Sequence, residues 1–215
     1  MTAKPGIKRR ELILAAALQL FNEQGSHKVS TNHIAKAMGI SPGNLYYHFK
    51  NKEHIVRELL ARLIEGFDSL VHMRGEVKSG IDLIAETIAA TARLIYEYRF
   101  IYIELAALLA RDEMFKTMYQ DIKERRAREF GTLFDFVAQM GGFRRTIPTE
   151  EQNAIVFIVW TYAEAIITAL HTSNIPVTPA AIQIHFKKIV YILKGYLTPV
   201  LWSALAQKLD LSEKP

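Results

Sequence analysis

The stretch STNHIAKAMGISPGNLYYHFKNK, residues 30–52, decides how this chain folds. Ser30 is a favourable N-cap for a first helix, and Gly39 can adopt the left-handed backbone conformation that ends it. Ser41 and Pro42 then provide the N-cap and the first residue of a second helix. The apolar residues of the first helix share one face: Ile34, Ala35 and Met38. The short turn between the two helices predicts a helix-turn-helix.

The second helix combines a narrow apolar face with an unusual polar surface. Leu45 and Phe49 lie four residues apart, so they share a face that we expect to be buried. The other positions carry a small residue, an amide, two phenols, an imidazole and two ammonium groups: Gly43, Asn44, Tyr46, Tyr47, His48, Lys50 and Lys52. Groups of this kind can approach base edges and phosphates closely. The alternative is that Tyr46 and Tyr47 pack against another part of the domain.

Positive charge is concentrated around this motif. The chain of 215 residues carries a formal net charge of +5, and half of it is hydrophobic, which is enough for a substantial core. Residues 1–60 hold nine Lys or Arg and four Asp or Glu, so they account for the whole excess. A phosphate-binding surface needs this asymmetry, because neutralised phosphates release condensed counterions. The first four basic residues are expected to form a flexible arm that either contacts DNA or stays solvated: Lys4, Lys8, Arg9 and Arg10.

Cysteine is absent, which excludes disulfides and Cys-based zinc sites. The N-terminal basic cluster and the apolar residues after it superficially resemble a signal peptide, but Gln19, Asn22 and Glu23 interrupt the apolar run. We therefore expect an amphipathic helix there, a cytoplasmic location and no membrane association.

The rest of the chain carries apolar residues at helical spacing. The pattern predicts helices over 8–23, 52–75, 81–98, 100–109, 112–140, 150–171, 179–194 and 198–209. Alternation with a period of two residues is absent, so the predicted fold class is all-α. The 52–75 helix, with Asn51 as its N-cap, is expected to link the N-terminal helices to the remainder. No Pro-, Gly- or Ser-rich linker separates the two parts.

The segment AIVFIVWTYAEAIITAL, residues 154–170, is the most apolar of the chain. It is shorter than the roughly 20 apolar residues of a membrane span and contains Glu164. A helix that is apolar nearly all round is buried on two sides, so we expect one side to face its own core and the other a partner. This predicts a two-fold homodimer through the 150–171 and 179–194 helices.

The block ILAAALQLFNEQGSHKVSTNHIAKAMGISPGNLYYHFKNKEHI, residues 13–55, resembles the N-terminal region of the TetR/AcrR family of bacterial transcriptional regulators. The shared features include a Phe before the Gly that ends the first helix, and the run around Tyr46, with Lys52 after it. The resemblance covers about residues 8–58. It implies a three-helix DNA-binding domain over 8–58, with its helix-turn-helix at 31–50. A long helix would join this domain to a helical ligand-binding and dimerisation domain over 59–211.

The resemblance also implies which residues contact double-stranded DNA. Thr31 and Lys52 match positions that typically hold phosphates, whereas some relatives carry a basic residue where this chain has Pro42. Tyr46 and Tyr47 match phosphate anchors more often than base readers, so part of the specificity is expected to come from DNA shape. The predicted DNA-binding residues are Thr31, Ser41, Pro42, Gly43, Asn44, Tyr46, Tyr47, His48, Lys50 and Lys52.

The expected function is that of a ligand-responsive repressor, a homodimer on a near-palindromic operator. A small molecule in the C-terminal core would shift the long linking helix and release the DNA. The candidate ligand residues are aromatic or charged, and ordinary core packing is their alternative role: Arg93, Tyr96, Tyr102, Tyr119, Phe157, Trp160 and Glu164.

Two other classes of function are alternatives. One is a helical enzyme, but the chain holds no HExxH, GxGxxG or P-loop motif, and its seven His show no metal-ligand spacing. No enzyme activity, metal or cofactor is therefore expected. The other is a dimeric interaction module without DNA binding, which the basic N-terminal region argues against.

Overall fold

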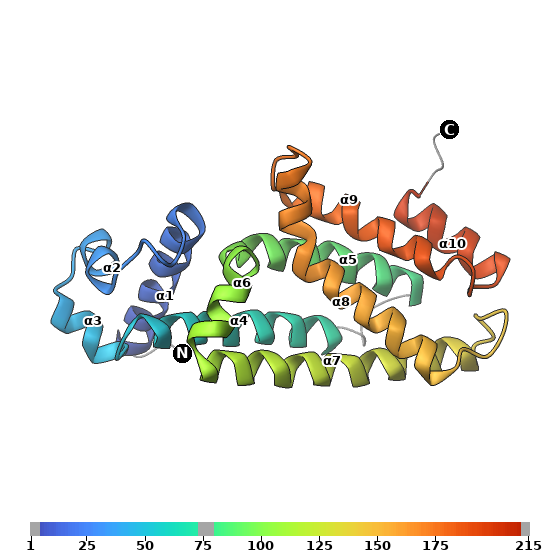
Figure 1. Cartoon of the computed structure of the whole chain (residues 1–215), viewed down its shortest axis with the longest axis horizontal. Coiled ribbons are helices and arrows are strands. Elements are labelled where there is room, and N and C mark those ends of the chain that lie inside the picture. Colours follow the sequence, from blue (N-terminus) through green and yellow to red (C-terminus); the bar gives the residue numbers. More distant parts are fainter. Residues whose placement is uncertain (1–4, 73–79, 212–215) are drawn as a thin grey trace. The chain divides into compact units, whose positions relative to one another are not determined.

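The computed structural model describes residues 5–72 and 80–211, and this part of the chain is almost entirely helical (Figure 1). The elements are α1 (Pro5–Gln24), α2 (Thr31–Ala37), α3 (Pro42–His48), α4 (Lys52–His72), α5 (Gly80–Glu97), α6 (Arg99–Arg111), α7 (Glu113–Gln139), α8 (Thr149–Thr172), α9 (Pro179–Ile189), the 3₁₀ helix η2 (Val190–Leu193) and α10 (Pro199–Leu209). Among the described residues the only β-type pairing is an isolated bridge between Phe143 and Leu197. The all-α prediction is confirmed.

The helix boundaries agree with the predicted ones to within a few residues, with two differences. The predicted 179–194 helix is α-helical only as far as Ile189 and then tightens into η2. Such 3₁₀ turns are frequent at the ends of α-helices. The predicted basic arm is also wrong for residues 8–10, because α1 already begins at Pro5. Lys4 and the predicted end of the 52–75 helix lie outside the described residues.

Local hydrogen bonds explain the helix-turn-helix. The Ser30 hydroxyl accepts a hydrogen bond from the His33 backbone N–H at 3.2 Å, and the His33 ring accepts one from the Ser30 N–H, which completes a capping box. Gly39 has φ +63° in the turn, a conformation that costs glycine little. The Ser41 hydroxyl caps α3 through the Asn44 N–H at 3.2 Å. The predicted caps are therefore confirmed.

The chain divides into two compact units that do not follow the order of the sequence. Among the described residues, the first unit comprises those within 1–66 and 98–118, and the second comprises those within 67–97 and 119–215. The boundaries fall inside α4 and α7, so α6 belongs to the same unit as the helix-turn-helix. The predicted sequence domains, 8–58 and 59–211, remain a prediction.

The first unit has a core of aromatic and branched side chains. Its most deeply buried large residues include Phe21, Phe49, Phe100, Phe115, Ile13, Ile34 and Leu45. The Phe21 and Phe100 rings lie 5.2 Å apart, and the Asn22 side chain accepts a hydrogen bond from the Phe100 N–H at 3.1 Å. These contacts join α1 to the start of α6.

Ion pairs add to the packing of the first unit. Arg10 donates to Glu58 at 2.6 Å, which lowers the pKa of the Glu58 carboxyl from its ordinary value. The Arg10 guanidinium also lies over the Phe49 ring, 4.8 Å from its centre. Arg57 pairs with Asp112 at 2.7 Å. Arg10 is therefore part of the folded unit and not of a flexible arm.

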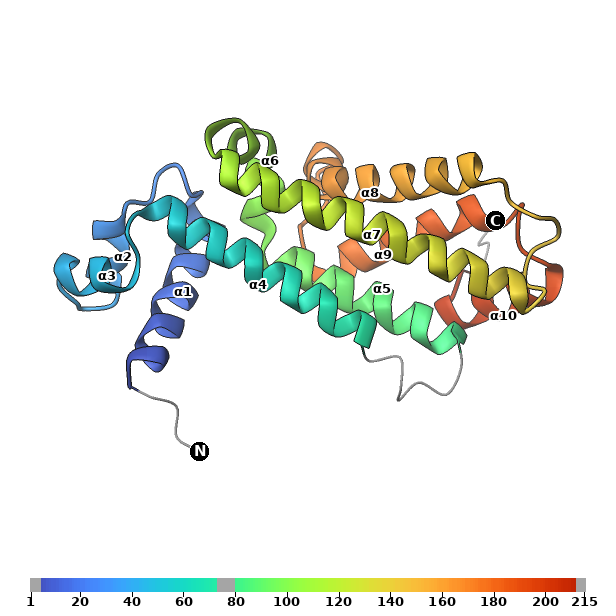
Figure 2. The same ribbon diagram turned by 90° about the horizontal axis from the view of Figure 1, so that it is seen from below.

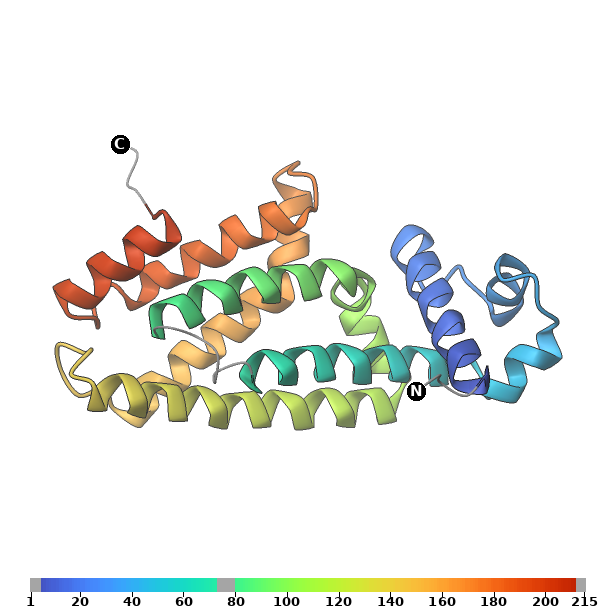
Figure 3. The same cartoon turned by 180° about the vertical axis from the view of Figure 1, so that it is seen from behind.

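In the second unit α9 packs against α5 and α8, and α10 packs against α5 (Figure 2 and Figure 3). One cluster of buried residues comprises Val190, Leu197, Leu205, Leu209 and Leu211. A second cluster comprises Phe134, Ile147, Ile155 and Val156. The buried guanidinium of Arg126 pairs with Asp68 and Glu129, which satisfies a charge that would be costly to bury alone.

Candidate nucleic-acid interface

Helix α3 separates its apolar face from its polar face as the sequence pattern predicts. Leu45 and Phe49 are fully buried, whereas Tyr46 is 50% exposed and Tyr47 is 86% exposed. Packing against another part of the domain, the alternative interpretation, is therefore wrong for Tyr47, whereas Tyr46 is half-exposed and its phenol contacts the Thr31 hydroxyl of α2. A phenol that is mostly exposed on a folded domain is available to a partner.

The other predicted DNA-binding residues of this region lie on the same accessible surface. The exposed residues are Ser41, Pro42, Gly43, Asn44 and Lys50. His48 is half-buried, and its ring meets the Tyr47 ring edge-on at 5.1 Å. The α3 surface therefore offers an amide, phenols and an imidazole with no acidic side chain among its residues.

A solvent-open pocket of about 270 Å³ lies at the start of α2 and α4. It brings together three of the predicted residues, Thr31, Tyr46 and Lys52. The Thr31 hydroxyl and the Tyr46 phenol lie 3.0 Å apart, within hydrogen-bond distance. His27, Lys28 and Ser30 also line the pocket, although they were not predicted as site residues. The charge count included Lys28, but nothing in the sequence placed it beside Lys52.

The pocket has the chemistry of a phosphate site. Its lining combines ammonium groups with hydroxyls, and His27 and Lys28 are exposed. Ammonium and hydroxyl groups are frequent donors to DNA phosphate oxygens. The Ser30 hydroxyl is already engaged as the α2 cap, so it is the weakest donor of the set.

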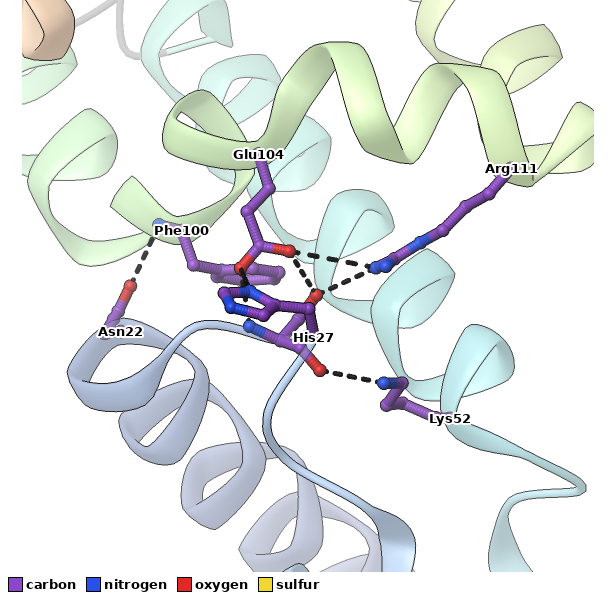
Figure 4. Close-up of polar contacts among 7 residues, drawn as sticks. Asn22, His27, Lys52, Phe100, Glu104 and Arg111 are labelled. Atoms are coloured by element: carbon purple, nitrogen blue, oxygen red, sulfur yellow. Dashed lines mark hydrogen bonds and ion pairs between the residues drawn. The ribbon is translucent and has the colours of Figure 1, made fainter.

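Lys52 is held in a defined position at the edge of this pocket. Its ammonium donates to the Ser26 carbonyl at 2.8 Å (Figure 4). The Ser26 N–H and hydroxyl each donate to the Glu104 carboxylate at 2.6 Å. Arg111 donates to the Ser26 hydroxyl at 2.8 Å. Sequence reasoning missed Glu104 and Arg111, because both lie on α6, far along the chain from the helix-turn-helix.

The candidate ligand residues are only partly brought together. Within the second unit the Glu164 carboxylate accepts hydrogen bonds from Trp160 at 2.6 Å and from Tyr119 at 3.0 Å, and Lys123 lies 3.5 Å away. Phe157, in contrast, is 62% exposed, so it faces solvent and is not part of this cluster.

The remaining candidates lie apart from that cluster. Arg93 is exposed, so the expectation of a charge enclosed by apolar residues is wrong for it. Tyr96 is half-buried on α5, and Tyr102 belongs to the first unit. The cluster at Glu164 agrees with the expectation that this half-buried charge has partners within the protein.

Comparisons with known proteins give a consistent result. Residues 13–59 match the family model described as bacterial regulatory proteins, tetR family, and residues 62–202 match the model described as bacterial transcriptional repressor. The transcriptional regulator UidR of Escherichia coli K12 is 29% identical over 132 residues, which are 60% of this chain and 63% of UidR. The chain thus matches less than two thirds of the length of this relative.

Two further proteins extend the comparison. The transcriptional repressor KstR2 of Rhodococcus jostii is 38% identical over 89 residues, which are 41% of this chain and 42% of KstR2. The crystal structure of a TetR-family transcriptional regulator from Marinobacter aquaeolei superposes with a TM-score of 0.83 at 25% identity, and the match covers 98% of both chains. Because the two family models together span most of the chain, this protein belongs to the TetR family of bacterial transcriptional regulators.

Proposed function

We propose that this protein is a homodimeric repressor that binds a near-palindromic operator in the cytoplasm and releases it when a small molecule binds the second unit. The observation that carries the DNA-binding part is the exposed α3 surface beside the pocket that contains Thr31, Tyr46 and Lys52. In a dimer, two α3 helices would enter successive major grooves about 34–36 Å apart.

The roles on DNA divide between phosphates and bases. Thr31, Tyr46 and Lys52 surround one pocket and would hold a single backbone phosphate. Asn44, whose amide can pair with adenine in the major groove, is the best candidate for base readout on α3. Tyr47, the most exposed tyrosine of α3, would contact a second phosphate. With few base readers, DNA shape would supply part of the specificity.

Dimerisation would use the outer face of α8. Its exposed residues recur every three or four positions: Ala154, Phe157, Ile158, Thr161, Ala165 and Thr168. Phe157 is 62% exposed, Ile158 45% and, on α9, Ile184 55%. Exposed apolar residues that are contiguous along helices mark interaction sites. A second copy of this face would complete the four-helix interface expected from the sequence.

The same helix also has the length and composition of a membrane span, and only a small part of it is buried in the protomer. One such helix is weak evidence for a membrane, because core helices meet the same criterion. A dimer accounts for the apolar surface, and Glu164 within the helix disfavours insertion into hydrocarbon. Dimerisation is therefore the better explanation of α8.

The effector would bind in the second unit, near the aromatic side chains of α7 and α8. Tyr119 and Trp160 are suited to a flat or apolar molecule. Its binding would shift α4, the helix that carries Lys52 at its first residue, and so change the separation of the two α3 helices. A coupling free energy of about 1–3 kcal/mol would change operator affinity by roughly 5- to 150-fold, enough for a switch.

One titration tests the DNA-binding part. Purified protein is mixed with the DNA upstream of its own gene, and affinity is measured over a series of salt concentrations. For about 6–10 phosphate contacts in the dimer, the slope of log K against log[salt] should be roughly −5 to −9. Binding that is absent, or independent of salt, would instead favour an interaction module without DNA binding.

A further inference from the structure

A carboxylate on α6 fixes the loop that enters the DNA-facing helices. Both Glu104 oxygens are engaged by Ser26, one by the backbone N–H and the other by the hydroxyl, each at 2.6 Å (Figure 4). The Glu104 side chain is 10% exposed and Ser26 is fully buried. Hydrogen bonds to an ionised carboxylate are the strong ones in proteins. A charged group 78 residues away therefore sets the position of the loop.

Ser26 passes this constraint to the phosphate pocket. Its carbonyl oxygen accepts the hydrogen bond from the Lys52 ammonium at 2.8 Å, so Glu104 and Lys52 bind opposite sides of one residue. The next two residues, His27 and Lys28, line the pocket together with Lys52. A shift of Ser26 would therefore move three of the cationic or ionisable groups that face the pocket.

The residue before Ser26 shows how closely the loop fits. Gly25 has φ +83°, and a Cβ atom there would lie 2.7 Å from the His27 ring and 3.1 Å from a Glu104 oxygen. Arg111 donates to the Ser26 hydroxyl and lies 3.8 Å from Glu104, so it balances the carboxylate charge. In this conformation the loop satisfies Ser26, Glu104 and Arg111 together.

We infer that Glu104 is a positioning residue for DNA binding: through Ser26 it holds Lys52, His27 and Lys28 in the arrangement that receives a backbone phosphate. The inference rests on the proposed phosphate role of this pocket. Glu104 itself touches no DNA. Its contribution is preorganisation, which improves affinity by reducing the ordering that binding would otherwise require.

The direction in which a substitution at Glu104 changes DNA affinity distinguishes positioning from simple electrostatics. Glu104→Gln removes a negative charge from a protein that binds a polyanion, so Coulomb interaction alone would tighten DNA binding. If Glu104 acts by positioning, the same substitution should weaken DNA binding. The NH₂ group of the glutamine amide would face the Arg111 guanidinium, and two hydrogen-bond donors cannot pair. The loop would also lose the carboxylate that accepts both hydrogen bonds from Ser26.

The experiment compares E104Q with the matched control Glu113→Gln. Glu113 lies in the same compact unit, its side chain is 82% exposed and its ion-pair partner is Lys116, so E113Q makes the same charge change without touching the loop. Affinity for the upstream DNA and for a random duplex is measured from low to physiological salt. E104Q should weaken binding to both at least fivefold relative to E113Q.

The salt slope gives a second readout that a merely structural role would not move. Loss of one phosphate contact per protomer should make the slope shallower by about 0.9 for each protomer in E104Q, and E113Q should keep the wild-type slope. E104Q binding as tightly as E113Q, with an unchanged slope, overturns the inference. Both variants are compared at a temperature at which circular dichroism shows each of them folded.

A double-mutant cycle with Lys52→Met tests the route through Ser26. If Glu104 positions Lys52 together with His27 and Lys28, E104Q should change affinity by a smaller factor in the K52M background than in the wild type, because only His27 and Lys28 then remain to be positioned. Multiplicative effects contradict the inference. Should E104Q fail to fold, Ser26→Ala removes the hydroxyl bond to Glu104 without altering charge, and it should weaken binding in the same direction but by less, because the backbone N–H bond to Glu104 remains. Wild-type protein without salt-dependent binding refutes the proposed function, and normal wild-type binding with multiplicative effects refutes only the role of Glu104.

Discussion

Replacing Asp112 by alanine should destabilise the unit that carries the helix-turn-helix. The Asp112 side chain is 8% exposed, and one oxygen accepts a hydrogen bond from Arg57 at 2.7 Å. The other oxygen accepts one from the Phe115 N–H at 3.0 Å, which caps the start of α7. The substitution therefore removes both the partner of a largely buried guanidinium and a helix cap.

The structure indicates the size of the loss. Removing one partner of a buried ion pair costs about 3–5 kcal/mol. The Arg57 side chain is still 20% exposed, so we place the pair at the lower end of that range. With about 1 kcal/mol for the lost cap, D112A should cost about 3–4 kcal/mol. At about 2–4 °C per kcal/mol, Tm should fall by roughly 6–16 °C.

The assay is urea unfolding followed by far-UV circular dichroism, with Asp112→Asn and Arg57→Met as companions. D112N keeps an acceptor for the Phe115 N–H and loses only the charge, so it should cost about half as much as D112A. The double variant D112A/R57M should be more stable than the sum of the single losses predicts, because neither charge is then left unpaired. A D112A loss below about 1 kcal/mol, or additive losses in the double variant, would refute the reasoning.

Three further outcomes are expected. Gly25→Ala should lower the free energy of unfolding by at least about 1 kcal/mol more than Gly39→Ala, since both have positive φ but only Gly25 lacks room for a Cβ atom. Equal losses in thermal unfolding would contradict this expectation. Burial, with Arg10 nearby, lowers the pKa of His54 from its ordinary 6.5, so the unfolded imidazole binds a proton more readily than the folded one. The stabilisation should therefore be complete above about pH 6.5 and be lost as the pH falls through the lowered pKa, and His54→Gln should flatten this dependence in urea titrations. Phe157→Glu should convert the proposed dimer into a monomer in sedimentation at micromolar concentration, with Phe157→Leu as the control that keeps the dimer; a wild-type monomer would remove the proposed interface altogether.

Several of these sites could be located from the sequence and several could not. The tyrosines of α3 were predicted to be exposed and are. Glu164 was expected to have a partner within the protein, and its carboxylate accepts hydrogen bonds from Trp160 and Tyr119. Arg10, in contrast, looked like part of a flexible arm and pairs with Glu58, which lies 48 residues further along the chain.

The sequence by itself determined the helix-turn-helix, because caps and turns depend on neighbours three or four residues apart. Ser30, Gly39 and Ser41 act through such short-range hydrogen bonds and backbone preferences, and each has the role that its residue type predicts. The charge excess around this motif is likewise a property of composition.

Only the tertiary structure decided what holds this motif in place. Glu104 meets Ser26 across 78 positions, and Asp112 meets Arg57 across 55. The residues around a single Glu or Asp on a helix do not identify its partner, because the pairing depends on how α6 and α7 pack beside α1 and α4 within the first unit. The residues proposed to face DNA can therefore be identified from the sequence, whereas the residues proposed to position them can be identified only in the folded chain.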